Sequence, residues 1–259
     1  MSKTILKNQR LKEIMAALDE SGSVTVQNLS RKLKVTPETI KRDLEGLERE
    51  GKLKRVYGGA IGAGENIEEF DAHTRETINI SEKMNLASIA ADFVNEGSLV
   101  ALDDSTTNIE IAKNLAKKFS NLTCITNSFA IAQIFAKTPK MRILLASGRL
   151  NNKDLYTYGQ SAINFIRMYH ADIFFMSASG ISLDNGIMDY GFDQFDVKMA
   201  MKESSSRVFC VADNTKFEKT ATIKVCDLDD VDGIITDKNI NLKLIEKLTE
   251  LGVNLFYPQ

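Results

Sequence analysis

Two groups of side chains in this 259-residue sequence could recognise another molecule through hydrogen bonds and charge. The first group lies within residues 36–42 and combines hydroxyl, carboxylate and basic side chains: Thr36, Glu38, Thr39, Lys41 and Arg42. Side chains of these types contact base edges and phosphates in nucleic-acid complexes. The second group is the run Asp-Asp-Ser-Thr-Thr at 103–107, whose hydroxyl groups are suited to a phosphate. Secondary structure must place each group before it can act.

The first group is predicted to lie on a helix with one charged and one apolar face. Thr36 suits the N-cap position and Pro37 the first helical position. The apolar residues that follow recur at helical spacing and are expected to face inward: Ile40, Leu44 and Leu47. Lys41 and Arg42 then face outward. An ordinary surface helix with a solvated charged face would explain this segment equally well if it stood alone.

The neighbouring segments favour a DNA-binding helix. A helix over 7–18 and a short helix over 26–33 are expected to precede it, with a tight turn at 34–35. Residues 51–59 alternate basic and apolar side chains between glycines, as a small β-wing does. This layout is that of a helix-turn-helix with a wing. Arg10, on the first helix, is expected either to touch a phosphate or to be solvated.

We therefore expect this region to bind double-stranded DNA. Four residues are expected at base edges: Thr36, Glu38, Thr39 and Arg42. Phosphate contacts are expected mainly from Lys41, Lys54 and Arg55, and Tyr57 completes the set of candidates. Charge agrees with this expectation, because residues 1–60 carry 13 Lys and Arg against 8 Asp and Glu, whereas the remainder carries 20 against 27. The overall net charge of −2 thus conceals a basic head on an acidic body.

From about residue 80, short apolar runs alternate with helical patterns. The runs are Leu99–Leu102, Leu122–Ile125, Arg142–Leu145, Ile173–Met176, Val208–Val211 and Gly233–Ile235. Helices are expected near 82–95, 107–118, 128–137, 160–169, 193–204 and 241–251. Continuous apolar strands separated by helices predict a mainly parallel sheet covered on both faces. The fold class is therefore α/β, with domains at 1–60 and 81–259 joined by a linker at 61–80.

Polar residues follow the predicted strands, and parallel sheets bind ligands at the carboxyl ends of their strands. Ser105, Thr106 and Thr107 open the next helix, where backbone N–H groups and hydroxyls suit a phosphate. Plain N-capping would explain the same three residues. The remaining ligand candidates are Asp103, Thr126, Asn127, Ser147, Gly148, Lys198, Asp213 and Lys216. The aspartates could accept hydrogen bonds from sugar hydroxyls or could simply cap strand ends. The lysines could balance a phosphate or lie at the surface.

Other features of the sequence argue against a disulfide-rich, metal-binding or membrane protein. The three cysteines form no C-x-x-C pair, and the two histidines lack metal-ligand spacing, so we expect no disulfide framework, metal or cofactor. No apolar run reaches the roughly 20 residues of a membrane helix, and no signal peptide is evident, so a cytoplasmic protein without membrane contact is expected. The glycine-rich stretch 58–66 is interpreted as linker. A dinucleotide-binding loop is the weaker alternative, because the spacing is not G-x-G-x-x-G.

The sequence resembles the DeoR family of bacterial transcription regulators over nearly its whole length. The most specific segment is Thr39–Leu44 (Thr-Ile-Lys-Arg-Asp-Leu), followed by Leu47, Gly51 and 57–60. In the second half, 102–107, 126–127, 197–201 and 212–217 match further motifs. The resemblance implies a winged-helix head and a body similar to sugar-phosphate isomerases that senses a phosphorylated sugar. It also implies a repressor of a carbohydrate operon that assembles as a homo-oligomer, either a dimer or a tetramer.

Four positions depart from the family pattern. Ser105 and Ser147 stand where glycine is common, Lys41 replaces a frequent arginine, and Tyr57 replaces a frequent histidine. A serine side chain in the phosphate loop is expected to crowd or retune the ligand site. Two rival interpretations therefore stay open beside the repressor. One is a sugar-phosphate isomerase with an accessory head, and the other is a regulator whose body serves only for oligomerisation.

Overall fold

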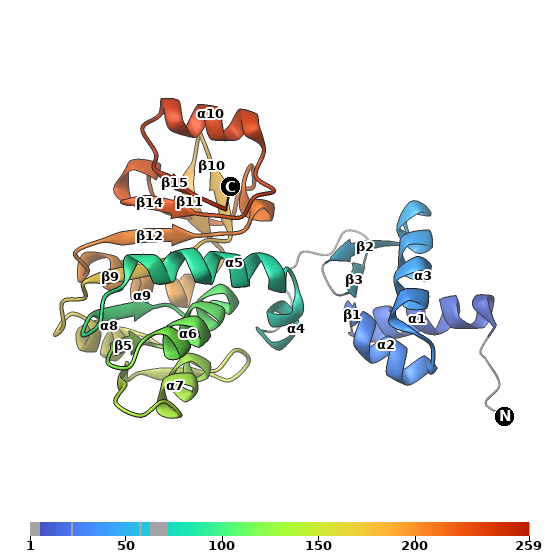
Figure 1. Ribbon diagram of the computed structural model, residues 1–259, viewed down its shortest axis with the longest axis horizontal. Coiled ribbons are helices and arrows are strands. Elements are labelled where there is room, and N and C mark those ends of the chain that lie inside the picture. The colour runs from blue at the N-terminus through green and yellow to red at the C-terminus, as the bar shows by residue number, and fades with distance from the viewer. Residues whose placement is uncertain (1–5, 22, 57–58, 63–71, 259) are drawn as a thin grey trace. The chain divides into compact units, whose positions relative to one another are not determined.

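The computed structural model describes residues 6–21, 23–56, 59–62 and 72–258. The chain divides into two compact units, Met1–Ile80 and Ser81–Gln259, which we call the head and the body. Both units are shown in Figure 1. Each is built around its own hydrophobic core, so each is described by itself.

The head is a winged helix, as predicted. Its helices are α1 (Lys7–Ser21), α2 (Val26–Leu33) and α3 (Pro37–Arg49). An antiparallel sheet in the order β1-β3-β2 forms the wing, from β1 (Ser23–Thr25), β2 (Leu53–Val56) and β3 (Gly59–Gly62). Lys34 takes a left-handed conformation at φ 53°, which ends α2 and makes the turn tight. Thr36 then caps α3 by accepting a hydrogen bond from the Thr39 amide at 3.3 Å.

The glycine-rich stretch interpreted as linker contributes a strand of the head. Gly59–Gly62 form β3, which lies between β1 and β2 in the sheet. A Cβ atom at Gly59 would lie 1.9 Å from the backbone oxygen of Val24, so glycine is required there by close strand packing rather than by flexibility. The rest of the predicted linker, 63–71, lies outside the described residues, and Ala72–Thr77 form helix α4.

The body is built on a seven-stranded parallel sheet. Its order is β15-β14-β12-β9-β4-β5-β6. The strands are β4 (Leu99–Leu102), β5 (Thr123–Thr126), β6 (Arg142–Leu145), β9 (Ile173–Ser177), β12 (Val208–Val211), β14 (Gly233–Ile235) and β15 (Leu255–Phe256). All six predicted strands are present, and the predicted α/β class is confirmed. The sequence analysis did not foresee β15.

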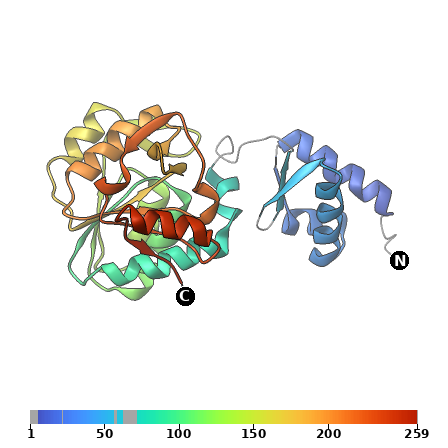
Figure 2. The same cartoon turned by 90° about the horizontal axis from the view of Figure 1, so that it is seen from above.

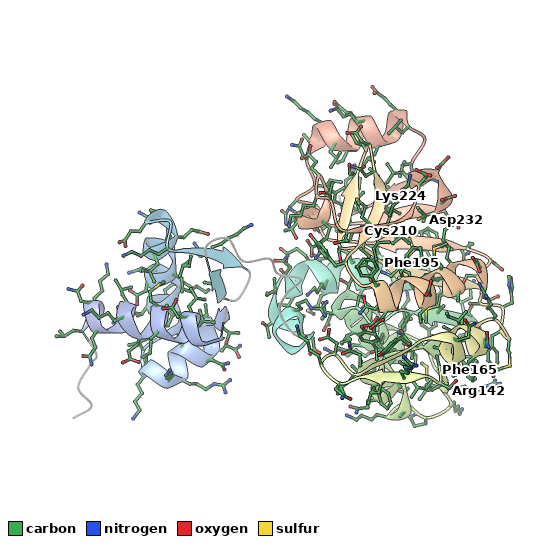
Figure 3. All side chains as sticks on the ribbon, turned by 180° about the vertical axis from the view of Figure 1, so that it is seen from behind. Arg142, Phe165, Phe195, Cys210, Lys224 and Asp232 are labelled. Atoms are coloured by element: carbon green, nitrogen blue, oxygen red, sulfur yellow. The ribbon has the colours of Figure 1, made fainter. Side chains whose placement is uncertain are left out.

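Helices cover both faces of this sheet. The body helices are α5 (Ile80–Ala90), α6 (Thr106–Lys118), α7 (Phe129–Ala136), α8 (Gln160–Ile166), α9 (Phe192–Glu203) and α10 (Leu242–Glu250). Figure 2 shows α5 and α9 on opposite sides of the sheet. Phe165 of α8 and Phe195 of α9, labelled in Figure 3, pack against the core on their side.

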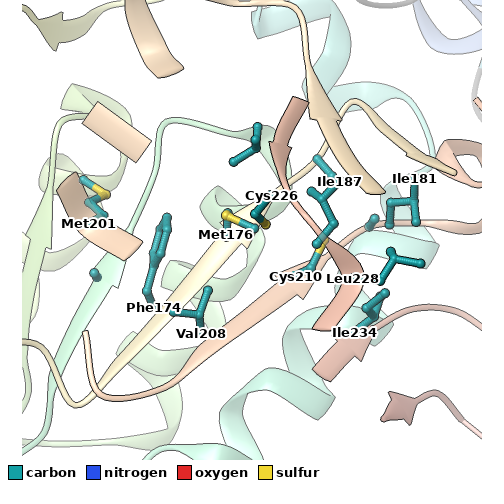
Figure 4. Close-up of a cluster of buried hydrophobic side chains, with 14 of the residues drawn as sticks. Phe174, Met176, Ile181, Ile187, Met201, Val208, Cys210, Cys226, Leu228 and Ile234 are labelled. Carbon is teal, nitrogen blue, oxygen red and sulfur yellow. The ribbon is translucent and has the colours of Figure 1, made fainter. Parts of the chain in front are cut away.

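Alternate residues of each strand enter two separate cores. On β9, Phe174 and Met176 join the core under α8 and α9, whereas Ile173 and Phe175 join the core under α5, α6 and α7. Burial on both faces explains why these strands appear as continuous apolar runs. Figure 4 shows part of the first core, where Met176, Cys210 and Cys226 lie close together. The three cysteines are buried thiols.

Two smaller sheets were not predicted. One is the hairpin of β7 (Arg149–Asn151) and β8 (Tyr156–Tyr158). The other has the order β10-β11-β13 and consists of β10 (Gly180–Ser182), β11 (Gly186–Asp189) and β13 (Ile223–Cys226). β11 is buried throughout, and it places an aspartate beside the end of the main sheet.

The order of the parallel strands has a functional consequence. Chain progression runs outward from β4 through β5 to β6, and then resumes on the other side of β4 with β9, β12, β14 and β15. The two halves therefore diverge between β4 and β9. In open parallel sheets, ligands bind at the carboxyl ends of the strands at such a switch point.

Candidate nucleic-acid interface and ligand site

Helix α3 presents the predicted DNA-binding residues on the outer surface of the head. Thr36, Glu38, Lys41 and Arg42 are exposed, and Thr39 is half-buried. The Thr36 and Thr39 hydroxyls lie 2.9 Å apart at the start of the helix. Lys41 Nζ lies 3.9 Å from a Glu38 carboxylate oxygen, a loose surface pair. The predicted inward stripe of Ile40, Leu44 and Leu47 is buried, so the outward direction of the charged face is confirmed.

The wing adds two exposed cations. Lys54 and Arg55 lie on β2, and both side chains are exposed. The Arg55 amide donates a hydrogen bond to the Glu48 carboxylate at 2.7 Å, which ties the wing to the end of α3. Tyr57 lies outside the described residues. The structure therefore brings seven of the eight predicted DNA-binding residues onto α3, its N-cap and β2.

Arg10 does not lie at the surface. Its side chain is buried, and Nη2 donates a hydrogen bond to Asp43 Oδ1 at 3.0 Å, while Nε donates to Oδ2. The Asp43 carboxylate raises the pKa of the Arg10 guanidinium. The expectation that Arg10 touches a phosphate or is solvated is therefore wrong. Sequence reasoning missed Asp43 because a charged residue on an apolar stripe is normally assigned to the solvent.

The predicted ligand residues of the body gather along the carboxyl edge of the sheet. They follow β4, β5, β6 and β12, which are all parallel, and Lys198 reaches the same edge from α9. Ser105 caps α6, where its hydroxyl accepts a hydrogen bond from the Asn108 amide at 3.0 Å. Thr106 and Thr107 are buried in the first turn of that helix. The positive end of the α6 dipole thus lies beside the switch point.

Lys198 and Asp103 belong to a buried charged network. Lys198 Nζ contacts a carboxylate oxygen of Asp189, lies 3.5 Å from Asp103 Oδ2 and donates to the backbone oxygen of Ser177 at 2.8 Å. Asp103 Oδ2 also accepts from the Ser177 amide at 2.8 Å and from its hydroxyl at 2.9 Å. Asn108 donates to Asp103 Oδ1 at 2.7 Å. The network links β4, β9, β11 and α9 at the switch point.

Electrostatics hold this network in its charged form. Burial opposes ionisation of Asp189, but the Lys198 ammonium and the Ser179 hydroxyl outweigh it and keep the pKa of Asp189 below its ordinary value. Burial would likewise lower the pKa of Lys198, yet Asp189 and Asp103 raise it. Two carboxylates thus already neutralise the ammonium. Asp189 was missed because the short strand β11 carries no clear signal in the sequence.

At the ends of the neighbouring strands, several polar atoms are buried. Thr126 Oγ1 accepts from the Ser128 amide at 3.1 Å, and Asn127 Nδ2 donates to the Thr157 oxygen at 3.0 Å. Among the described residues, three buried side-chain atoms have no hydrogen-bond partner: Asn108 Oδ1, Asn127 Oδ1 and Thr236 Oγ1. Asn127 and Thr236 directly follow β5 and β14, and Asn108 lies in the first turn of α6, the helix that follows β4. Buried acceptors of this kind require a donor, from water or from a ligand.

The remaining ligand candidates follow β6 and β12 at the carboxyl edge of the sheet. Ser147 and Gly148 are exposed after β6, and the Ser147 hydroxyl donates to the Ser161 oxygen at 3.3 Å. Gly148 has a φ of 144°, and a Cβ there would lie 2.5 Å from the backbone oxygen of Tyr158. Asp213 is buried after β12 and accepts from the Thr215 amide at 2.9 Å. Lys216 is half-buried in the short helix Asn214–Lys216.

Two further observations concern other kinds of site. Within the part of the chain that the structure describes, no helix has the length and apolar character needed to cross a membrane. No group of three or more His, Cys, Asp or Glu side chains in that same part is arranged to hold a metal ion.

A winged-helix head together with an α/β body that gathers polar side chains at a switch point is typical of a transcription regulator. The sequence patterns of known families agree: residues 10–64 match the DeoR-like helix-turn-helix domain, and residues 78–238 match the DeoR C-terminal sensor domain. The chain belongs to the DeoR family.

Individual relatives support this assignment along the whole chain. The HTH-type transcriptional regulator GolR of Listeria innocua serovar 6a is 31% identical, with 95% of this chain and 96% of that protein covered. The glycerol-3-phosphate regulon repressor of Escherichia coli (strain K12) is 28% identical, over 96% of this chain and 98% of that one. The relatives are regulators and repressors, so the chain is a regulator rather than an enzyme.

A solved structure of a sugar-phosphate isomerase resembles the chain weakly. The ribose 5-phosphate isomerase A of Methanocaldococcus jannaschii aligns with a TM-score of 0.39 and 15% identity, covering 54% of this chain and 55% of that one. A likeness at this level carries no argument about activity. The fold class rests instead on the strand order and the helical layers described above.

Proposed function

We propose that this chain is a sequence-specific DNA-binding repressor of a carbohydrate operon in the cytoplasm, controlled by a phosphorylated sugar that binds the body. The observation that carries the proposal is the outer face of α3, where Thr36, Glu38 and Arg42 project from the solvent side of a winged helix. A recognition helix of this kind enters the major groove with its N-terminal residues at base edges. Lys54 and Arg55 on the wing supply phosphate contacts.

The ligand part of the proposal is supported by the switch point. The α6 N-terminus, with Ser105 as its cap, is suited to a phosphate. The unpartnered acceptor atoms of Asn108 and Asn127 are suited to the hydroxyl groups of a sugar. One relative is named for the glycerol-3-phosphate regulon, which is consistent with a phosphorylated polyol as effector class. A homo-oligomer would present two α3 helices to half-sites about one helical turn apart, near 10 base pairs.

Binding of the purified chain to its own promoter DNA tests both parts together. Fluorescence anisotropy is measured across a salt series, with the promoter duplex and a shuffled duplex of equal length, with and without a panel of sugar phosphates. We expect tight binding to the promoter, a steep salt dependence and a change produced by one sugar phosphate. The unphosphorylated sugar and inorganic phosphate are the matched controls.

The possible results separate the rival interpretations. Promoter binding that no sugar phosphate alters would favour a body that serves only for oligomerisation. Equal affinity for promoter and shuffled DNA would refute sequence-specific recognition. Turnover of a sugar phosphate by the chain would support the isomerase alternative, which the regulator names of the relatives oppose.

A further inference from the structure

A buried ion pair joins the first helix of the head to the third. Arg10 of α1 is 8% exposed and Asp43 of α3 is 4% exposed. The guanidinium donates through Nη2 to Asp43 Oδ1 at 3.0 Å and through Nε to Oδ2. Two parallel hydrogen bonds between a planar guanidinium and a carboxylate fix the relative orientation of both groups. The pair therefore constrains the directions in which the two helices face.

Both residues occupy positions that the apolar stripes would otherwise fill. Arg10 lies one turn before Ile14, and Asp43 lies one turn before Leu47 and three residues after Ile40. All three of these apolar residues are buried in the head core. A buried ion pair costs desolvation energy, and apolar residues of similar volume commonly replace such a pair without loss of stability. Stability alone therefore does not account for a charged pair in this core.

The ion pair differs from the apolar contacts of the core because its hydrogen bonds are directional. Contacts between apolar side chains are non-directional, so they tolerate a small rotation of a helix about its axis. The two parallel hydrogen bonds of the Arg10 guanidinium do not tolerate such a rotation. Successive helical residues are about 100° apart around the axis, so fixing the direction of Asp43 also fixes the direction of its neighbour Arg42. The exposed position of Arg42 agrees with this geometry.

We propose that Arg10 and Asp43 are positioning residues for DNA recognition. Their pair sets the rotation of α3, and thereby the direction in which Arg42 and the Thr36–Thr39 turn meet base edges. Neither residue contacts DNA in this arrangement. The inference rests on the proposed DNA-binding function, and it assigns discrimination between sequences, rather than general affinity, to the buried pair.

Replacement of both partners by apolar residues tests the inference. In the full chain, R10M/D43L removes both buried charges of the pair at once. We expect its unfolding temperature to equal or exceed that of the wild type. Its affinity for shuffled DNA and the slope of its salt dependence should stay within about twofold of the wild-type values, because no phosphate contact is lost. Affinity for the promoter should fall at least about tenfold.

Two further variants keep the test sharp. R10K retains the charge but loses the fork, so we expect a folded head with reduced promoter discrimination, even if the double variant fails to fold. R167Q/E203Q removes an exposed pair of 2.9 Å between α9 and the residue after α8 and should leave both affinities unchanged. Both variants are measured on the same two duplexes.

The results distinguish this inference from the function on which it rests. A wild-type chain that binds both duplexes equally would refute the proposed function. A wild-type chain that discriminates, together with folded R10M/D43L and R10K variants that discriminate equally well, would overturn the positioning role. Equal loss of affinity for both duplexes in a folded variant would also overturn it, since that result indicates general support of the head.

Discussion

Arg42 is the exposed residue of α3 on which the DNA-binding proposal depends most. It lies six residues after the cap, with its side chain exposed, while Lys41 beside it is loosely paired with Glu38. If Arg42 contacts a guanine edge, Arg42→Ala should cost about 1–3 kcal/mol of promoter binding and relax preference at one base pair. Competition binding against a set of single-base promoter variants measures both effects.

Lys54 on the wing is the matched control for Arg42. A phosphate contact carries no sequence information, so Lys54→Ala should weaken binding to promoter and shuffled DNA alike and reduce the salt slope by about 1. An Arg42→Ala variant with the same uniform loss and unchanged base preference would remove Arg42 from the base-reading residues.

Lys198 should make the stability of the body depend on pH in a specific way. Burial opposes ionisation of Asp189, but Lys198 holds the pKa of Asp189 below its ordinary value. The carboxylate therefore contributes stability above about pH 4 that is lost as pH falls through the folded pKa. In Lys198→Met the hydrogen bonds from the Ser179 hydroxyl and the Tyr190 amide remain, but burial is the larger effect, so we expect the pKa of Asp189 to rise above its ordinary value. In this variant Asp189 contributes to the stability of the body at low pH, and this contribution is lost as the pH increases.

The expected result for Lys198→Met is a loss of about 3–5 kcal/mol at pH 8, since two carboxylates remain buried without their partner, and a smaller loss at pH 5. Urea unfolding followed by circular dichroism at the two pH values measures both losses. Lys202, one turn further along α9 and 3.9 Å from the half-exposed Asp230, is the control. Lys202→Met should change stability by less than about 1 kcal/mol at either pH. An equal deficit at pH 5 and pH 8 in Lys198→Met would contradict the argument.

Elements differ in how far the sequence determines them. The six predicted strands of the main sheet are continuous apolar runs, because both faces of a parallel sheet are buried, and all six are present. Helix α3 was likewise predictable from its cap and its apolar spacing. The strands β7, β8, β10, β11 and β13 are interrupted by polar residues or glycine and form no continuous apolar run, so local patterns do not identify them.

The same distinction applies to the candidate site. Ser105, Asn127 and Asp213 were predicted from sequence because they lie within three residues of the ends of apolar runs. The partners of Lys198 could not be found, because Asp189 reaches it through the unpredicted sheet. Arg10 was misplaced for a related reason, since its partner Asp43 lies 33 residues away. Long-range pairing of charges leaves no periodic signal in the sequence.

At the wing, Gly59 permits β3 to lie against β1. Gly59→Ala would place a Cβ 1.9 Å from the Val24 oxygen, and backbone cannot move aside as a flexible side chain can. We expect a loss of about 1–3 kcal/mol in head stability, measured by thermal unfolding. Gly46→Ala is the matched control, because nothing lies within 4 Å of its Cβ position near the C-terminal end of α3. Gly46→Ala should stabilise the head by about 0.5–1 kcal/mol, so the two substitutions are expected to change stability in opposite directions. Stabilisation by both substitutions would contradict the packing argument.

At the scale of the whole molecule, regulation requires a coupling free energy between ligand binding in the body and DNA binding by the head. If a sugar phosphate changes promoter affinity by some factor, promoter DNA must change affinity for that sugar phosphate by the same factor. We expect titration calorimetry of the sugar phosphate, with and without saturating promoter duplex, to return the factor found from anisotropy. The shuffled duplex at equal concentration is the control. A sugar phosphate that weakens DNA binding, but whose own affinity is unchanged by the promoter, acts through ionic strength and not through a coupled binding site. The body would then have no regulatory role toward this ligand.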